Sequence, residues 1–199
     1  GGTTCFNDMY FFPEITAKQA IHHNIRAKVG LIVIDFPSVW ARNSDEYIEK
    51  GLSLHEQLRQ SELCTTAFAP HAPYTVSDEP LQKIKTLADE LELPIHIHLH
   101  ETLHEVEQAQ SNSGQRPLQR LQKLGLINPS LIAVHMTQLT DEEISLFAES
   151  GAHIVHCPES NLKLASGFCQ VAKCLNAGIN VAIGTDGAAS NNDLDMFGE

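Results

Sequence analysis

Basic residues are scarce in this sequence of 199 residues, which contains 13 Lys and Arg against 25 Asp and Glu. The formal net charge is −12 at pH 7, and no cluster of Lys or Arg stands out. Nucleic acid and anionic membrane surfaces are themselves negative, so this balance argues against both as partners. No apolar run is long enough to cross a bilayer, and we therefore expect no membrane association.

Closely spaced cysteine pairs are missing as well. The five cysteines are scattered without a C-x-x-C pair, at Cys5, Cys64, Cys157, Cys169 and Cys174. Such cysteines are typical of reduced thiols in or near the core of an intracellular protein, so we expect a cytoplasmic location. No linker or low-complexity tract divides the sequence, which favours one domain over residues 1–199.

Apolar, β-rich runs alternate with segments of helical periodicity along the whole sequence. The predicted strands are 3–8, 29–35, 65–70, 94–100, 131–136, 152–156 and 179–184. The predicted helices are 16–28, 44–61, 79–91, 103–110, 117–124, 141–149 and 168–176. Ser77 and Thr140 precede acidic residues as helix N-caps. The predicted helix stops are Gly125, Gly151 and Gly178.

Seven strands that alternate with helices predict a parallel sheet in an α/β protein. A doubly wound sheet usually carries a Gly-rich phosphate loop after its first strand, and none is present. A (β/α)8 barrel needs eight strands. The sequence begins at Gly1 without Met, and it stops at Glu199 just after a Gly/Asn-rich loop. We therefore expect an incomplete (β/α)8 TIM-type barrel that lacks its first strand, as a piece of a longer catalytic domain.

The strand predicted at 94–100 ends in an unusual concentration of histidine. His96, His98 and His100 alternate with apolar residues, so they are expected to share one face of the strand. Burying three imidazoles is costly unless something binds them. Glu101 adds a carboxylate directly after the strand. This stretch predicts a hydrolytic metal site, which needs a neutral nitrogen ligand and a nearby acid or base.

Polar residues also lie at, or directly after, the C-terminal ends of the neighbouring predicted strands. They are His71, His135, His156 and Asp186. A single histidine at a strand end is typical of packing, and Asp186 alone is typical of a turn. In a barrel, however, catalytic groups come from the C-terminal ends of different strands. The recurrence of His and Asp at the ends of successive predicted strands therefore indicates an active site.

Four segments of the sequence resemble the amidohydrolase superfamily, in its branch of 5-methylthioadenosine/S-adenosylhomocysteine deaminases and related chlorohydrolases. They are His-Ala-Pro-Tyr at 71–74, Ile-His-Leu-His-Glu-Thr at 97–102, Ser-Asn-Leu-Lys-Leu at 160–164 and Gly-Thr-Asp-Gly-Ala-Ala-Ser-Asn-Asn at 184–192. The resemblance covers essentially the whole chain. It implies a metal-dependent deaminase that acts on a small nucleoside-type substrate, converting an adenosine-type ring to the inosyl product and ammonia. One divalent ion per site is implied, with zinc favoured over iron.

The resemblance also implies a role for individual residues. His98 and Asp186 would bind the metal ion, and Asp186 would also accept a proton from the attacking water. Glu101 would protonate the substrate ring nitrogen, while His135 would hydrogen-bond the water or the developing tetrahedral centre. The implied substrate contacts are His71, Glu101, Arg42 and Ser190. Arg42 is alternatively a solvated loop residue, and Ser190 is alternatively a loop cap.

One part of the family pattern is missing. The resemblance implies two further metal ligands from a His-x-His motif on the first barrel strand. The only histidine pair near the start, His22 and His23, has the wrong spacing and fits a solvated helix face. We therefore expect little activity from this segment alone.

The open alternatives are an aminohydrolase or chlorohydrolase that acts on a triazine, guanine or cytosine ring, and an inactive truncated fragment. A homo-oligomer is also left open.

Overall fold

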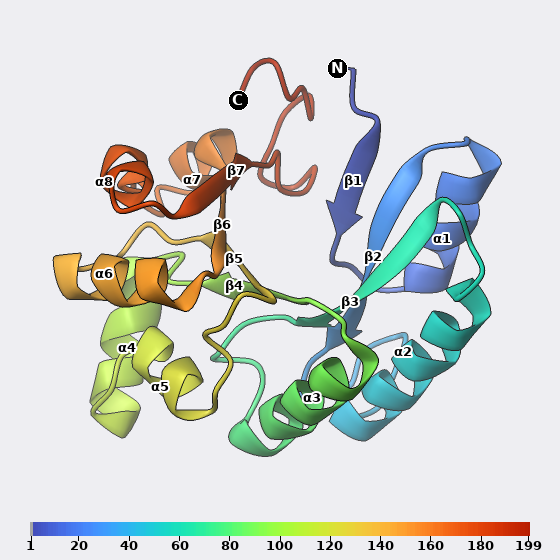
Figure 1. Cartoon of the computed structure of the whole chain (residues 1–199), viewed down its shortest axis with the longest axis horizontal. Helices are drawn as coiled ribbons and strands as arrows, with labels where there is room; N and C mark the ends of the chain where they lie inside the picture. Colours follow the sequence, from blue (N-terminus) through green and yellow to red (C-terminus); the bar gives the residue numbers. More distant parts are fainter. Residues whose placement is uncertain (1) are drawn as a thin grey trace. The chain divides into compact units, whose positions relative to one another are not determined.

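The computed structural model describes residues 2–199, which form two compact units, Thr3–His96 and Ile97–Glu199 (Figure 1). The strands follow one another in chain order, β1-β2-β3-β4-β5-β6-β7, and the pairs β1–β2, β2–β3, β3–β4, β5–β6 and β6–β7 are parallel. Parallel strands in chain order, alternating with helices, are the pattern of a (β/α)8 barrel. The predicted α/β fold class is confirmed.

The unit Thr3–His96 is built around two long, paired strands. Its elements are β1 (Cys5–Asp8), α1 (Pro13–His22), β2 (Arg26–Val33), α2 (Ser44–Leu58), β3 (Cys64–Pro70) and α3 (Asp78–Leu91). Seven residues of β2, from Ala27 to Val33, pair with the whole of β3. Gly30 is required within β2, because a Cβ atom there would lie 2.3 Å from the carbonyl oxygen of Asp8. Helices α1 and α2 both pack on β2, as Figure 1 shows.

The unit Ile97–Glu199 contains most of the chemistry-bearing strand ends. Its elements are β4 (Ile95–Leu99, which starts in the other unit), α4 (Leu103–Ser113), α5 (Pro117–Lys123), β5 (Leu131–His135), α6 (Asp141–Ser150), β6 (His153–His156), α7 (Pro158–Lys163), α8 (Val171–Asn176) and β7 (Asn180–Ile183). Its fully buried side chains include Leu99, Leu118, Leu121, Phe147 and Ile154. These apolar residues come from both strands and helices, so they fix the strand ends against the helical layer.

Two of the predicted helices have ends that differ from the structure, and one helix of the structure was not predicted. The helix predicted at 16–28 is wrong at its C-terminal end, because left-handed Asn24 (φ 55°) turns the chain and β2 begins at Arg26. Helix α7 was not predicted, since six residues are too few to show helical periodicity. The helix predicted at 168–176 begins only at Val171.

Most of the predicted helix ends are confirmed. Thr140 forms a capping box with Glu143, in which each side chain accepts a hydrogen bond from the other residue's backbone N–H. The three predicted glycine stops, Gly125, Gly151 and Gly178, have φ values of 72, 73 and 84°, in the left-handed region that ends helices. Ser77 occupies the N-cap position of α3, as predicted, but its side chain makes no capping hydrogen bond.

Two further expectations concern cysteine and membranes. All five cysteines are free thiols, with Cys5 exposed and the other four buried, as predicted. Within residues 2–199, no helix combines the length and apolar character that a membrane span requires.

Candidate active site

His135 occupies the centre of a polar cluster at the end of β5. Its Nδ1 lies 2.9 Å from Oδ1 of the buried Asn161. Because an amide oxygen only accepts hydrogen bonds, this contact requires the proton on Nδ1 of His135. The other ring nitrogen, Nε2, lies 3.8 Å from Oε2 of Glu101 and 4.0 Å from Oδ2 of Asp186. The three predicted catalytic residues therefore converge around one ring nitrogen.

Asp186 follows β7 and is held by several donors. Its Oδ2 accepts hydrogen bonds from the hydroxyls of Ser160 (2.6 Å) and Ser190 (3.1 Å), while its Oδ1 accepts one from the backbone N–H of Gly187 (2.7 Å). The residue has left-handed backbone (φ 59°), as His135 does (φ 79°). Non-glycine residues in this conformation are often found at functional sites, where surrounding contacts maintain the strain.

His98 lies beside this cluster, on β4. Its ring centroid is 5.3 Å from that of His135. His98 and Asp186 offer a ring nitrogen and a carboxylate oxygen, which are donors that zinc accepts. No group of three or more His, Cys, Asp or Glu within residues 2–199 is arranged to hold a metal ion. The two predicted ligands therefore fit a part of a zinc site, and they do not make a complete one.

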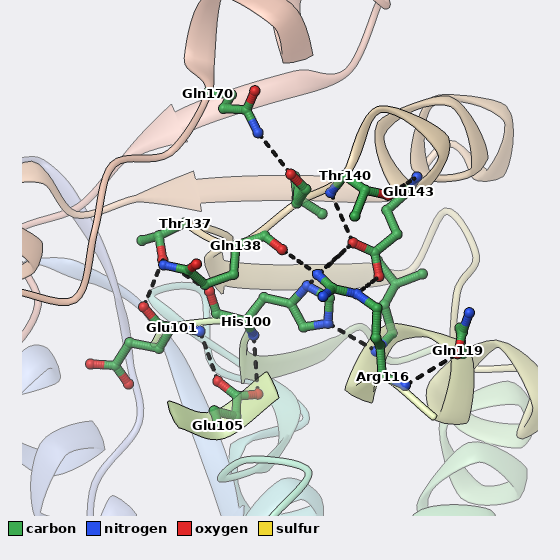
Figure 2. Close-up of polar contacts among 12 residues, drawn as sticks. His100, Glu101, Glu105, Arg116, Gln119, Thr137, Gln138, Thr140, Glu143 and Gln170 are labelled. Atoms are coloured by element: carbon green, nitrogen blue, oxygen red, sulfur yellow. Dashed lines mark hydrogen bonds and ion pairs between the residues drawn. The ribbon is translucent and has the colours of Figure 1, made fainter. Parts of the chain in front are cut away.

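His100 does not share the face of His96 and His98, so that expectation is wrong. β4 ends at Leu99, and left-handed His100 (φ 51°) redirects its fully buried ring toward α5 and α6 (Figure 2). Its Nε2 accepts a hydrogen bond from the backbone N–H of Leu118 (3.2 Å), and its Nδ1 is 3.8 Å from Oε2 of Glu143. Burial lowers the pKa of His100 to about 4, so the ring is neutral.

A buried ion pair lies next to His100. Arg116 donates to both carboxylate oxygens of Glu143, from Nε to Oε1 (2.6 Å) and from Nη2 to Oε2 (2.9 Å). The Nη2 group also contacts the backbone carbonyl of Gln138, as Figure 2 shows. The side chains are 17% and 7% exposed, respectively, so little water screens the pair. The pair joins the start of α5 to the start of α6.

Glu105 is a buried carboxylate that the sequence analysis did not assign. Its backbone N–H donates to Oγ1 of Thr102, the N-cap of α4 (3.1 Å). Its own oxygens accept from the backbone N–H groups of His100 and Glu101. Burial raises the pKa of Glu105 from 4.5 to about 7, against the opposing effect of these hydrogen bonds. The spacing Thr-x-x-Glu at 102–105 is the signal that could have revealed it.

The raised pKa of Glu105 predicts a pH-dependent difference between the protein and its Glu105→Gln variant. A raised pKa means that the folded state holds a proton which the unfolded state releases. The stability associated with Glu105 is therefore fully present below pH 4.5 and is lost as the pH rises to about 7. Because glutamine mimics the protonated carboxyl, we expect the native protein to lose up to about 3 kcal/mol relative to the variant across this range.

Urea denaturation of both proteins between pH 4 and 8 measures this difference. Subtracting the two free energies of unfolding cancels the contributions of other titrating groups, including the neutral His100. A difference that stays constant across the range would contradict the prediction.

Two predicted substrate contacts, His71 and Arg42, belong to the unit Thr3–His96. His71 directly follows β3, where its Nδ1 is 3.0 Å from Oγ1 of Thr75, and burial lowers its pKa. The Arg42 side chain is 85% exposed and pairs with Glu46 at the start of α2 (2.8 Å). The pair His22 and His23 is exposed at the end of α1, as expected of a solvated helix face.

Helix α7 contributes two site residues to which the sequence analysis gave no chemical role. Ser160 holds Asp186, as described above. The amide of Asn161 bridges two histidines, since its Nδ2 donates to Nδ1 of His156 (3.4 Å) while its Oδ1 accepts from His135. The Ser-Asn-Leu-Lys segment was the available signal, but its proximity to His135 depends on a helix that was not predicted.

Comparison with known families decides which class of protein this cluster belongs to. The model of the amidohydrolase family matches residues 1–199. This chain belongs to the amidohydrolase family. The matched range includes every residue of the cluster around His135, so the family assignment and the site concern the same part of the molecule.

Several relatives of this amidohydrolase chain are deaminases. It is 54% identical over 198 residues to the 5-methylthioadenosine/S-adenosylhomocysteine deaminase of Saccharophagus degradans, of which it covers 44%. It is 38% identical to the 5'-deoxyadenosine deaminase of Methanothrix thermoacetophila, covering 46%. Both matches cover 100% of this chain. The chain thus spans about half the length of the curated relatives it matches.

A solved structure is similar over the whole chain. The crystal structure of an adenosine deaminase from Xanthomonas campestris with bound zinc matches with a TM-score of 0.98 and 57% identity. The match covers 100% of this chain and 45% of that one. This similarity supports the TIM-type fold class inferred from the strand order.

Proposed function

We propose that the protein is a metal-dependent hydrolytic deaminase that converts S-adenosylhomocysteine or 5-methylthioadenosine to the inosyl product and ammonia. The observation that carries the proposal is the convergence of Glu101 and Asp186 on Nε2 of His135, at 3.8 and 4.0 Å. This arrangement places an acid, a base and a hydrogen-bond acceptor at one point. The similarity to relatives named as adenosine-type deaminases supports the choice of substrate.

We propose that His98 and Asp186 hold one divalent metal ion, with zinc favoured over iron. When bound, such an ion lowers the pKa of a coordinated water to about 7. The hydroxyls of Ser160 and Ser190 orient the Asp186 carboxylate for this role. We place the remaining ligands in residues outside this sequence, so that residues 1–199 form one part of a single catalytic barrel domain.

Proton movements in the proposed reaction follow from the geometry of the chain's own residues. Nε2 of His135 accepts a hydrogen bond from the attacking water, because Asn161 keeps the ring proton on Nδ1. Asp186 accepts a proton from that water as its oxygen adds to the amino-bearing ring carbon. Glu101 donates a proton to the adjacent ring nitrogen. Asp186 then passes the proton that it took from the water to the amino group, and the C–N bond breaks to release ammonia. The new hydroxyl returns a proton to Glu101 as it becomes the carbonyl of the inosyl product.

The proposed function is tested with the full-length protein purified in the presence of zinc. We expect ammonia release from S-adenosylhomocysteine, 5-methylthioadenosine or 5'-deoxyadenosine, and little from guanine, cytosine or a chlorinated triazine. A chelator should abolish the release, and added zinc should restore it. Activity on a triazine or free base alone would overturn the proposed substrate, and activity that survives complete metal removal would overturn the proposed metal dependence.

A further inference from the structure

The turn that carries Glu101 is unusual because its backbone is strained at the preceding residue. His100 has a left-handed backbone (φ 51°), which bulky non-glycine residues rarely adopt. The turn joins β4 to α4 and contains only a few residues before the N-cap Thr102. Such a conformation persists only when surrounding contacts specify it. The contacts of this turn therefore fix the position of the Glu101 backbone, from which its side chain extends.

Glu105 holds the N–H side of this turn. Its Oε1 accepts a hydrogen bond from the backbone N–H of His100 (3.1 Å), and its Oε2 accepts one from the backbone N–H of Glu101 (2.7 Å). The carboxylate thus spans two consecutive residues with two separate oxygens (Figure 2). Glu105 is only 6% exposed, so water competes little for these donors.

Thr137 holds the carbonyl side of the same turn. Its backbone N–H donates to the carbonyl oxygen of His100 (3.0 Å). Its hydroxyl lies 2.7 Å from the carbonyl oxygen of Glu101, as drawn in Figure 2, and 3.2 Å from that of His100. Thr137 is 6% exposed and follows β5 two residues after His135. It therefore ties the Glu101 turn to the strand that ends in the cluster's central histidine.

Together the two residues engage every backbone hydrogen-bonding group of His100 and Glu101. We propose that Glu105 and Thr137 are positioning residues that hold Glu101 for proton transfer, an inference that rests on the proposed deaminase function. With its main chain held in this way, Glu101 moves only through its side-chain torsions. From this main-chain position, the carboxylate lies 3.8 Å from Nε2 of His135. Such pre-organisation accelerates a reaction because small misplacements of a reacting group are costly.

Kinetics of the full-length protein test this proposal through variants of Glu105 and Thr137. We expect Glu105→Ala and Thr137→Val to lower kcat by roughly 10- to 100-fold while KM changes little, because positioning acts on the chemical step. Glu105→Gln should recover part of the rate, since it keeps the side-chain shape and one acceptor oxygen. Glu107→Ala, an exposed change on the same helix, is the matched control and should have no effect.

A double-variant comparison separates positioning from a general structural role. Glu105→Ala added to Glu101→Gln should cause no further loss of kcat, because Glu105 acts only through Glu101. An equal loss in both backgrounds would overturn the proposal. So would a rise in KM without a fall in kcat.

Amide hydrogen exchange provides a readout that does not depend on deaminase activity. In Glu105→Ala we expect faster exchange at the N–H groups of His100 and Glu101, with exchange in α2 unchanged. Unchanged exchange at His100 and Glu101 would overturn the proposed role. If the native protein releases no ammonia from any nucleoside, the proposed function fails, while the exchange measurement still decides whether Glu105 holds the turn.

Discussion

Glu101→Gln is expected to lower kcat for ammonia release by roughly 10²- to 10⁴-fold, the range that general acid–base catalysis contributes. Glutamine matches glutamate in shape, so the turn held by Glu105 and Thr137 should be retained. It cannot release a proton to the substrate ring nitrogen, however. We therefore expect KM to change far less than kcat. Steady-state kinetics of the full-length, zinc-loaded protein with S-adenosylhomocysteine measure both constants.

Glu107→Gln provides the matched control for this prediction. Glu107 is exposed on α4, so Glu107→Gln makes the same chemical change outside the cluster around His135. Its activity should equal that of the native protein. If Glu101→Gln retains a rate within a few-fold of the native value, the proton transfers assigned to Glu101 belong to another group.

Glu143→Ala is expected to destabilise the protein by about 3–5 kcal/mol, which is typical when one partner of a buried ion pair is removed. The substitution leaves the Arg116 guanidinium without its bidentate carboxylate partner. It also removes the acceptor for the backbone N–H of Thr140, which caps α6. Both lost interactions lie close to the buried ring of His100 (Figure 2).

Urea denaturation near pH 7 measures this effect, with Glu142→Ala as the control. Glu142 is the adjacent residue of α6 and is exposed, so its loss should cost well under 1 kcal/mol. Replacing Arg116 and Glu143 together by methionine should recover part of the stability, because no unpaired charge then remains. A cost below 1 kcal/mol for Glu143→Ala would show that the pair contributes little.

Local patterns were sufficient for much of the fold and for part of the site. Apolar runs that alternate with helical periodicity predict the parallel sheet, since each element must bury one face against its neighbours. The same patterns place His98, His135 and Asp186 at or near strand ends. Those positions follow from strand length and alternation, which neighbouring residues in the sequence largely determine.

Local patterns could not predict which way these side chains point or which residues they contact. Alternation along β4 predicts one face for His96, His98 and His100, yet the left-handed backbone at His100 directs its ring toward Leu118 and Glu143. Local alternation fails there because the strand ends one residue earlier, and contacts with α5 and α6 stabilise the buried ring.

The sequence by itself determined the α/β fold class, the strand ends that carry His98, Glu101, His135 and Asp186, and the resemblance to amidohydrolases. Only the tertiary structure decided which partners orient those groups. Asn161 sets the protonated nitrogen of His135, while Glu105 and Thr137 hold the Glu101 turn. The physical reason is that hydrogen bonds between residues distant in sequence depend on how strands and helices pack, and local periodicity does not encode that packing.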